Sequence, residues 1–334
     1  MKILMASGGS GGHIYPSLAL AEYLKKDDVY FIGYNNHMED RIINKDNFEF
    51  IGIDKRKGKY KSLWMEYRSI KKKIEELNPD LVIGWGNSLS FLSVLAAKRL
   101  GIKTIIHEQN IIPGKANKYS SYFVDDVVTS FEESNKYFKK SITLGNPRGE
   151  YVLLNSGQKY KLKKDKLNIL VVMGSLGSST VYSFIMDFIN TVKVDARFII
   201  SMGKNVRNNV DINNVNEVIV YDYIDSMGDM LKEVDLVISR AGATTISELL
   251  SLNVVSILIP SPYVASNHQY YNAKMLVDNG LALMIEEKKL DKNRLKNLID
   301  NRSMQLDIKM NLLKTKKKKG ISDFIKLIDE KYRM

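Results

Sequence analysis

The most constraining feature of the sequence is a repeated alternation between short β-branched apolar runs and amphipathic stretches. This alternation is typical of parallel strands joined by helices, because strands buried on both faces are apolar throughout. The first half predicts strands at Lys2 to Ala6, Val29 to Ile32, Phe48 to Ile53, Asp80 to Ile83, Thr104 to His107, Asp126 to Thr129 and Ser141 to Leu144. The second half predicts strands at Asn168 to Met173, Arg197 to Ser201, Glu217 to Tyr221, Asp235 to Ser239, Val254 to Ile259 and Ala282 to Ile285. The predicted fold class is therefore α/β, with two doubly wound Rossmann-like domains.

The length of 334 residues also suits two domains of ordinary size. A polar, lysine-rich stretch over 149–166 has little apolar periodicity and is predicted to be a linker. It separates an N-terminal domain, 1–148, from a C-terminal domain, 167–320. The last residues, 321–334, show helical spacing and are expected to pack back on the first domain.

Composition excludes several classes of protein. The chain has no cysteine, so it has no disulfide framework, thiolate nucleophile or cysteine zinc site. Its longest apolar runs, such as Val254 to Ile259, are far shorter than the roughly 18 to 20 residues of a membrane span. We expect a protein that is neither exported nor membrane-spanning. The net charge of +12 predicts an acidic partner: nucleic acid, an anionic lipid surface or a phosphorylated substrate.

A glycine-rich loop, Ser7 to His13, follows the first strand and leads into a helix. Glycines let the backbone approach an anion, and a helix amino terminus carries partial positive charge. The Walker lysine and the third glycine of a dinucleotide fingerprint are both missing. We interpret the loop as a phosphate or sugar site, the alternative being a tight turn without a ligand.

Two further strand-to-helix loops occur in the second half, Met173 to Ser179 and Ser239 to Thr245. Glu248 lies about one turn inside the second helix. One helix end could hold a diphosphate while the carboxylate accepts both hydroxyls of a ribose. The loops therefore predict a nucleoside diphosphate, although Glu248 alone could be an ordinary helix-start glutamate.

Polar runs at two other strand ends suit sugar hydroxyls. His107-Glu108-Gln109-Asn110 ends one strand, and His268 to Ala273 follows the turn at Pro260 to Pro262. Amides can both donate and accept hydrogen bonds, as a sugar requires. Helix capping is the competing interpretation of these asparagines.

These motifs together resemble those of the MurG family of glycosyltransferases. The matching segments are SGGSGGHIYP, IHEQNIIPGKANK, LGNPR, MGSLGS, SRAGATTISE and NHQYYNA, and they span nearly the whole chain. The resemblance implies a GT-B fold, in which two Rossmann-like domains face each other across a cleft. It also implies transfer of N-acetylglucosamine from UDP-N-acetylglucosamine, held by the C-terminal domain, to the membrane-borne acceptor lipid I, held by the N-terminal domain.

The resemblance assigns roles to residues of this chain. His13 is the expected catalytic base or acceptor-positioning residue. Donor contacts are expected from Ser10, Gly11, Gly12, Asn110, Arg148, Ser175, Leu176, Gly177, Ser178, Arg240, Ala241, Gly242, Thr244, Glu248 and Gln269. Acceptor contacts are expected from Gly8, Gly9, His13, His107, Glu108 and Asn117. The family usually has a second glycine loop, GGY, where this chain reads Gly84 to Ser88.

The implied reaction is displacement at the anomeric carbon with inversion, in which UDP leaves as the acceptor hydroxyl attacks. No Asp-x-Asp motif ends a strand, so we expect no metal, and no cofactor is implied. Helix amino termini and Arg240 or Arg148 would stabilise the leaving diphosphate.

A membrane surface is the expected site of action. Lys55 to Lys73 interleaves basic residues with Tyr60, Leu63, Trp64, Met65 and Tyr67, a composition suited to an anionic interface, although a solvated amphipathic helix would look similar. We expect peripheral attachment at the cytoplasmic face, with other cell-wall synthesis enzymes as partners. The alternatives are a diacylglycerol glycosyltransferase, a UDP-N-acetylglucosamine 2-epimerase and, more distantly, a nucleic-acid-binding protein.

Overall fold

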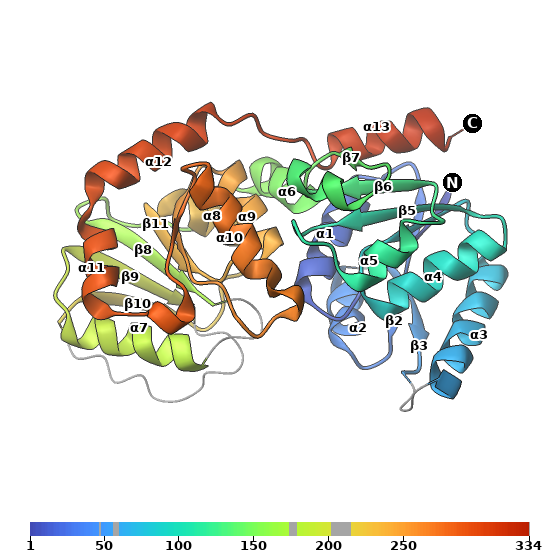
Figure 1. Cartoon of the computed structure of the whole chain (residues 1–334), viewed down its shortest axis with the longest axis horizontal. Coiled ribbons are helices and arrows are strands. Elements are labelled where there is room, and N and C mark those ends of the chain that lie inside the picture. Colours follow the sequence, from blue (N-terminus) through green and yellow to red (C-terminus); the bar gives the residue numbers. More distant parts are fainter. Residues whose placement is uncertain (47, 56–59, 174–178, 202–214, 334) are drawn as a thin grey trace. The chain divides into compact units, whose positions relative to one another are not determined.

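The computed structural model describes residues 1–46, 48–55, 60–173, 179–201 and 215–333, and its elements are labelled in Figure 1. The chain divides into two compact units. Unit 1 comprises Met1–Tyr151 together with Lys318–Met334, and unit 2 comprises Val152–Lys317. Each unit is built around its own parallel sheet.

Unit 1 contains a seven-stranded parallel sheet in the order β3-β2-β1-β4-β5-β6-β7. Its strands are β1 (Lys2–Ala6), β2 (Asp28–Tyr34), β3 (Glu49–Ile53), β4 (Leu81–Gly84), β5 (Lys103–Glu108), β6 (Asp126–Thr129) and β7 (Ile142–Thr143). Successive residues of β1 supply opposite cores: Ile3 and Met5 join one hydrophobic cluster, Leu4 and Ala6 the other. Both faces of the sheet are therefore buried, which explains the unbroken apolar runs of its strands.

Helices cover both faces of this sheet. They are α1 (Gly11–Ala21), α2 (Met38–Ile43), α3 (Tyr60–Leu77), α4 (Asn87–Arg99), α5 (Lys115–Ser120), the first part of α6 (Pro147–Asn155), and α13 (Ser322–Lys331). Two short 3-10 helices, Asn44–Asp46 and Glu132–Tyr137, lie in connecting loops. Ile70 and Ile74 of α3 pack in the same cluster as Leu89 of α4. Leu18 of α1 and Phe324 of α13 pack in the other.

Unit 2 repeats the design with a six-stranded parallel sheet in the order β10-β9-β8-β11-β12-β13. Its strands are β8 (Leu167–Val172), β9 (Ala196–Ser201), β10 (Glu217–Tyr221), β11 (Leu236–Ser239), β12 (Val255–Leu258) and β13 (Leu283–Met284). Its helices are α7 (Ser179–Thr191), α8 (Met227–Glu233), α9 (Ala243–Ser251), α10 (His268–Asp278), α11 (Lys292–Asp300) and α12 (Arg302–Lys314). The prediction of two doubly wound α/β domains is confirmed.

The junction between the units differs in detail from the predicted linker. Residues 149–155 are helical, because α6 begins at Pro147, a residue favoured in a first helical turn. The Glu150 carboxylate accepts the backbone N–H groups of Ile321 and Ser322 at 2.7 and 2.9 Å, so it satisfies donors at the start of α13. Ile321, Phe324 and Ile328 lie in the core of unit 1, so the last helix belongs structurally to the first unit.

Each sheet has a point where the strand order reverses. In unit 1 it lies between β1 and β4, and in unit 2 between β8 and β11. Loops at the carboxyl ends of such strands diverge and leave room for a ligand. The glycine loop follows β1, and the Arg240 to Gly242 loop follows β11, so both lie at switch points.

Candidate active site

The glycine-rich loop is held from behind by a buried carboxylate, Glu39 of α2. Its Oε2 accepts the Gly9 N–H at 3.1 Å and its Oε1 accepts the Tyr34 N–H at 3.2 Å. A Cβ on Gly8 would lie 2.6 Å from Glu39 Oε1, so any larger residue there would displace the Glu39 carboxylate. Gly9 adopts φ +80°, which also favours glycine. The Gly9 N–H is bound by Glu39, and the contact of Gly9 with the acceptor stays a prediction.

His13 lies in the first turn of α1 with a defined tautomer. Its Nδ1 is 3.0 Å from the Gly8 carbonyl oxygen, which can only accept, so Nδ1 carries the hydrogen and donates it. The Ser10 hydroxyl lies 3.4 Å from the same nitrogen. The lone pair of the neutral ring is therefore on Nε2. A Cβ on Gly86 would lie 2.9 Å from Nε2, so glycine at that position leaves the nitrogen space. This arrangement can accept a proton from a hydroxyl group.

Asn87 joins the loop after β4 to the glycine loop. Its Nδ2 donates to the Gly8 carbonyl at 2.6 Å, while its Oδ1 accepts the Ser90 N–H at 3.1 Å. Its φ of 71° lies in the left-handed region, which asparagine tolerates better than most residues. The Gly8 carbonyl thus accepts hydrogen bonds from both Asn87 and His13, and the two loops form one braced unit.

Behind these loops lies a buried aromatic stack. The Trp85 ring centroid lies 4.8 Å from that of His107 and 6.1 Å from that of Phe324 in α13. His107 is 0% exposed, and its Nε2 donates to the Gly145 carbonyl at 3.0 Å. The Gln109 amide lies 3.2 Å from His107 Nδ1 and 3.1 Å from the Trp85 carbonyl, donating to both. Since both ring nitrogens are bonded and buried, His107 cannot contact the acceptor and instead supports the loops.

Burial gives His107 an acid-sensitive contribution to stability. Desolvation, against the opposing effect of the Gly145 carbonyl and with a smaller contribution from the nearby His13, lowers its pKa to about 4. A neutral native ring with a higher pKa in the unfolded chain stabilises the fold fully above about pH 6.5, and this stabilisation is lost as the pH falls towards 4. We expect His107 to account for a loss of about 3 kcal/mol in unfolding free energy between pH 7 and 4.

The test is urea unfolding of the wild-type chain and His107→Gln at several pH values. The variant should show a shallower pH dependence. Parallel curves for the two proteins would contradict the assignment.

Glu108 and Asn117 brace the next loop rather than line a surface. They are 1% and 2% exposed. Glu108 Oε1 accepts the Asn110 N–H at 2.9 Å, and Oε2 accepts the Gly114 N–H at 3.1 Å and Asn117 Nδ2 at 2.9 Å. Burial raises the pKa of Glu108, although these hydrogen bonds favour its charged form. For Glu108 and Asn117, the predicted direct contact with the acceptor is therefore replaced by a role in positioning the loop. Asn110, by contrast, is partly exposed.

Arg148 lies near the start of α6, on the same unit as the glycine loop. Its guanidinium carbon is 4.7 Å from the Tyr151 ring centroid and 5.7 Å from that of Tyr15, which follows His13 on α1. Its backbone N–H donates to Asn146 Oδ1 at 3.0 Å. Two aromatic rings thus hold the cation beside the first turn of α1.

In unit 2, the helices α9 and α10 begin at the carboxyl ends of neighbouring strands, β11 and β12. Asn272 of α10 donates to the Ala241 carbonyl at 3.3 Å, which ties these two helix starts together. Gly242 is the residue before α9, and Thr244 lies in its first turn. The predicted phosphate-binding residues Ser175, Leu176, Gly177 and Ser178 lie outside the described residues, between β8 and α7.

Arg240 is buried and tied to its own unit. Its Nη1 donates to the Ile259 carbonyl at 3.0 Å and lies 2.7 Å from Glu287 Oε2. These contacts connect the loops after β11, β12 and β13. The geometry therefore gives Arg240 a bracing role in addition to any charge it offers a diphosphate.

Glu248 lies on α9 and Gln269 on α10, the helices that follow the loops after β11 and β12. Glu248 is 7% exposed on the second turn of α9. Gln269 Oε1 accepts the Ser261 N–H at 2.9 Å, which fixes the loop after β12. Ser266 and Asn267 both have positive φ, 53° and 50°, immediately before α10, and such backbone strain tends to be retained at functional sites. The geometry favours a ligand at this edge.

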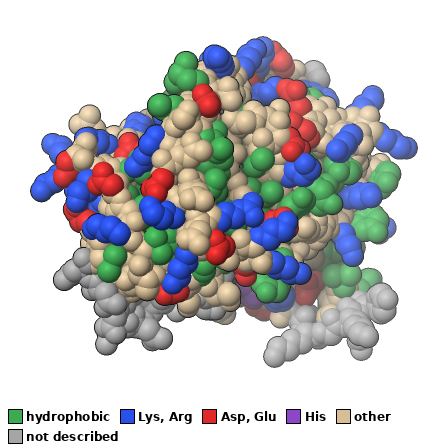
Figure 2. Space-filling model, turned by 60° about the vertical axis from the view of Figure 1, so that its left-hand side comes forward, with side chains coloured by type: hydrophobic (Ala, Val, Ile, Leu, Met, Phe, Trp, Pro, Cys, Tyr) green, Lys and Arg blue, Asp and Glu red, His purple; other side chains and the backbone are tan. Residues whose placement is uncertain are grey.

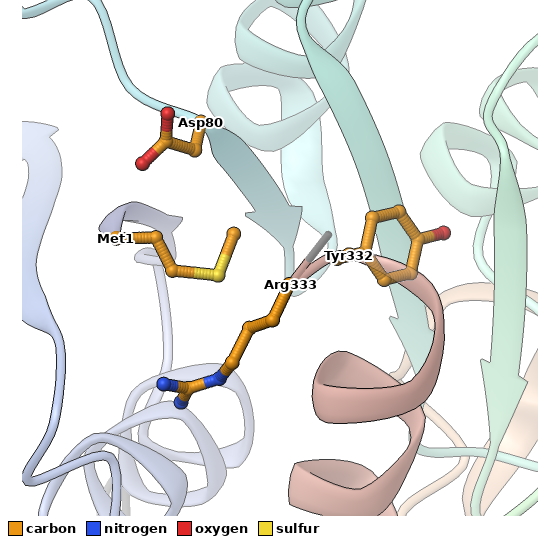
Figure 3. Close-up of a pocket in the computed structure, with 4 residues that line it drawn as sticks. All are labelled: Met1, Asp80, Tyr332 and Arg333. Carbon is orange, nitrogen blue, oxygen red and sulfur yellow. The ribbon is translucent and has the colours of Figure 1, made fainter.

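A pocket at the opposite edge of the unit 1 sheet does not belong to this site. Figure 3 shows its four lining residues, Met1, Asp80, Tyr332 and Arg333. Met1 and Asp80 precede β1 and β4, so the pocket lies at the amino ends of the strands. Within the described ranges no cluster of three or more His, Asp or Glu residues could hold a metal ion, and no helix has the length and apolarity to cross a bilayer.

Comparison with known proteins identifies the family. Residues 3–129 match the glycosyltransferase family 28 N-terminal domain, and residues 168–329 match the family 28 C-terminal domain. The chain belongs to glycosyltransferase family 28. These matches confirm the predicted family resemblance and the predicted GT-B fold class of this family 28 enzyme.

Two curated relatives align with almost the whole of this family 28 chain. Both carry the name UDP-N-acetylglucosamine–N-acetylmuramyl-(pentapeptide) pyrophosphoryl-undecaprenol N-acetylglucosamine transferase. The protein of Desulforamulus reducens is 36% identical and aligns over 99% of this chain and 98% of its own. The protein of Bacillus cytotoxicus is 37% identical and aligns over 97% of this chain and 96% of its own. The crystal structure of Acinetobacter baumannii MurG superposes with a TM-score of 0.81 at 25% identity, covering 98% of this chain and 99% of that one.

Sequence reasoning missed several residues that shape the family 28 site. Glu39, Asn87 and Glu287 all act through contacts with residues distant in the sequence. Only Asn87 had a local signal, because it lies in the segment that departs from the family's second glycine loop.

Proposed function

We propose that this enzyme transfers N-acetylglucosamine from UDP-N-acetylglucosamine to the 4-hydroxyl of N-acetylmuramic acid in lipid I, giving lipid II for peptidoglycan synthesis. The observation that carries the proposal is the 36–37% identity to transferases of that name over nearly the entire chain. The same likeness favours transfer to lipid I over diacylglycerol glycosylation or epimerisation. Transfer from the labelled donor to a lipid I analogue tests the proposal.

The geometry of His13 supports a single displacement. The acceptor oxygen would attack C1 of the donor sugar as its hydroxyl proton passes to His13 Nε2. The bond from C1 to the diphosphate oxygen breaks, UDP leaves with the electron pair, and the configuration at C1 inverts. The Gly8 carbonyl, by accepting from Nδ1, would stabilise the imidazolium that forms.

Departure of UDP requires stabilisation of developing negative charge. The amino termini of α9 and α10 supply partial positive charge at the edge where the diphosphate would lie. We propose that this suffices without a metal ion, as the lack of an Asp-x-Asp motif at a strand end also suggests. Activity in excess chelator is the corresponding expectation.

We assign Glu248 to the ribose hydroxyls of the donor. A carboxylate can accept two hydrogen bonds from a vicinal diol, and bonds to a charged group contribute about 1.5–3 kcal/mol. Glu248→Ala is therefore expected to raise the Kd for UDP about 10- to 100-fold. Titration calorimetry measures this change. Asp300→Ala, at an exposed residue of α11, should bind UDP normally. Equal affinity of the two variants for UDP would contradict the assignment of Glu248 to the donor site.

We further propose that α3 attaches the enzyme to an anionic membrane at the cytoplasmic face. Leu63 and Trp64 are 44% and 55% exposed, and Arg68 lies 4.7 Å from the Trp64 ring. Further along the helix, Ile70 and Ile74 are buried in the core of unit 1 and anchor α3 to it. Arg56 to Lys59, part of the predicted basic patch, lie outside the described residues. Aromatic and cationic side chains in this combination suit the headgroup region.

Trp64→Ser should weaken binding to phosphatidylglycerol-containing vesicles about 5- to 20-fold, because insertion of the ring is lost. Cosedimentation measures the bound fraction. Tyr223→Ser is the control, since Tyr223 is also exposed, at 56%, but lies on unit 2. Unchanged binding by the Trp64 variant would contradict the α3 assignment.

A further inference from the structure

An apolar stripe runs along the solvent side of α12 in unit 2. Leu306, Met310 and Leu313 are 65%, 53% and 56% exposed. Their spacing of four and three residues places them on one face of the helix. Exposed apolar residues scattered singly are ordinary, but three in register on one helix form a continuous surface.

The stripe lies outside the buried face of α12. Ile308 and Leu312, on the other side of the helix, are 5% and 1% exposed. Lys309 donates to the Asn253 carbonyl at 2.7 Å, and Asn311 Nδ2 to the Gly280 carbonyl at 3.1 Å. The inner face is therefore fully used to anchor the helix.

These anchors also place α12 away from the candidate active site. Asn253 precedes β12 and Gly280 precedes β13, so the helix is fastened at the amino ends of these strands. The starts of α9 and α10 lie at the carboxyl ends of β11 and β12. The stripe consequently lies apart from the residues assigned to the donor.

Charge around the stripe indicates what could cover it. Residues 302–317 contain five cationic residues, Arg302, Lys309, Lys314, Lys316 and Lys317, and one anionic residue, Asp307. Arg302, Lys314 and Lys316 are exposed. Figure 2, which brings the α12 side of Figure 1 forward, shows Lys and Arg side chains across the visible face, with hydrophobic and acidic side chains among them. A second copy of this segment would be repelled, whereas an anionic surface would be attracted.

We propose that the outward face of α12 lies in the headgroup region of an anionic bilayer, so that unit 2 makes a membrane contact of its own. Leu306, Met310 and Leu313 enter the boundary between headgroups and acyl chains, while Lys314 and Lys316 meet lipid phosphates. The contact deepens the proposed membrane function but depends on neither the transfer reaction nor α3.

The absence of cysteine from the chain allows a direct test. Met310→Cys in the full chain is labelled with an environment-sensitive fluorophore and mixed with vesicles of phosphatidylcholine, with or without phosphatidylglycerol. Tyr223→Cys, labelled in the same way at the carboxyl end of β10, is the control. We expect a blue shift and protection from an aqueous quencher only at position 310 and only with phosphatidylglycerol.

Two further variants separate the possible outcomes. Leu306→Ser with Leu313→Ser, in the labelled Met310→Cys chain, should reduce the lipid-induced shift at least about tenfold. Trp64→Ser should retain the shift at saturating lipid. A label at position 310 that stays solvent-exposed when the protein is bound to vesicles would overturn the proposal. A blue shift without lipid would also overturn it, because it would show that a second copy or another part of the protein covers the stripe. Transfer to a detergent-solubilised acceptor should be unchanged in these α12 variants, so failure of the transfer reaction itself would be recognised separately.

Discussion

Replacing His13 by glutamine is expected to lower kcat by about 10²- to 10⁴-fold, the usual range for removing a general base. The reason is geometric: the Gly8 carbonyl at 3.0 Å holds the hydrogen on Nδ1, so the neutral ring presents a basic Nε2 beside Gly86. Glutamine preserves polarity and approximate size but cannot take up a proton at that position. Steady-state kinetics with varied acceptor measure the effect, and the KM for UDP-N-acetylglucosamine should change little.

His37→Gln provides the matched control. His37 precedes α2, makes no side-chain hydrogen bond to that helix, and is not part of the candidate site. Its substitution should leave kcat within about twofold, as for most surface changes. A His13 variant whose kcat stayed within threefold of the wild type would rule out its role as base.

Trp85→Ala is expected to lower the free energy of unfolding of unit 1 by about 3–5 kcal/mol, the range for truncating a fully buried large aromatic residue. Trp85 is 0% exposed, and its ring packs against His107 and Phe324. The loss would therefore loosen both the strand-end loops and α13. Urea denaturation followed by circular dichroism measures the change.

The other tryptophan of the chain serves as the control. Trp64 is 55% exposed, so Trp64→Ala should change the unfolding free energy by no more than about 0.5 kcal/mol. Equal effects of the two substitutions would show that the Trp85 stack does not hold unit 1 together.

The strands were predictable because the central ones, such as β1, β4 and β11, are buried on both faces. The bounds of β1, β6 and β10 agree residue for residue with prediction, and those of the other strands differ by one or two residues at one or both ends. Continuous apolar runs between polar turns give this strong signal. The sheet order follows the general rule for doubly wound folds, which also places the glycine loop and the Arg240 loop at switch points.

The supporting contacts of the site could not be predicted in the same way. Glu39 reads as an ordinary helix-start glutamate, yet its carboxylate binds Gly9, thirty residues earlier. Likewise, the polar run His107 to Asn110 suggests a ligand-facing surface, but its first three residues are buried and bonded within the protein. Residue type reveals chemical capacity, whereas burial depends on long-range packing that local sequence does not encode.

The most direct test of the account is transfer of radiolabelled N-acetylglucosamine from its UDP donor to a lipid I analogue, measured with excess EDTA and alongside Glu248→Ala. We predict a labelled lipid II product, undiminished by the chelator and strongly reduced in the variant. Binding of UDP-N-acetylglucosamine without transfer to lipid I would contradict the account. The donor assignment would then be kept, but the acceptor would have to be another lipid, or the reaction would have to be an epimerisation.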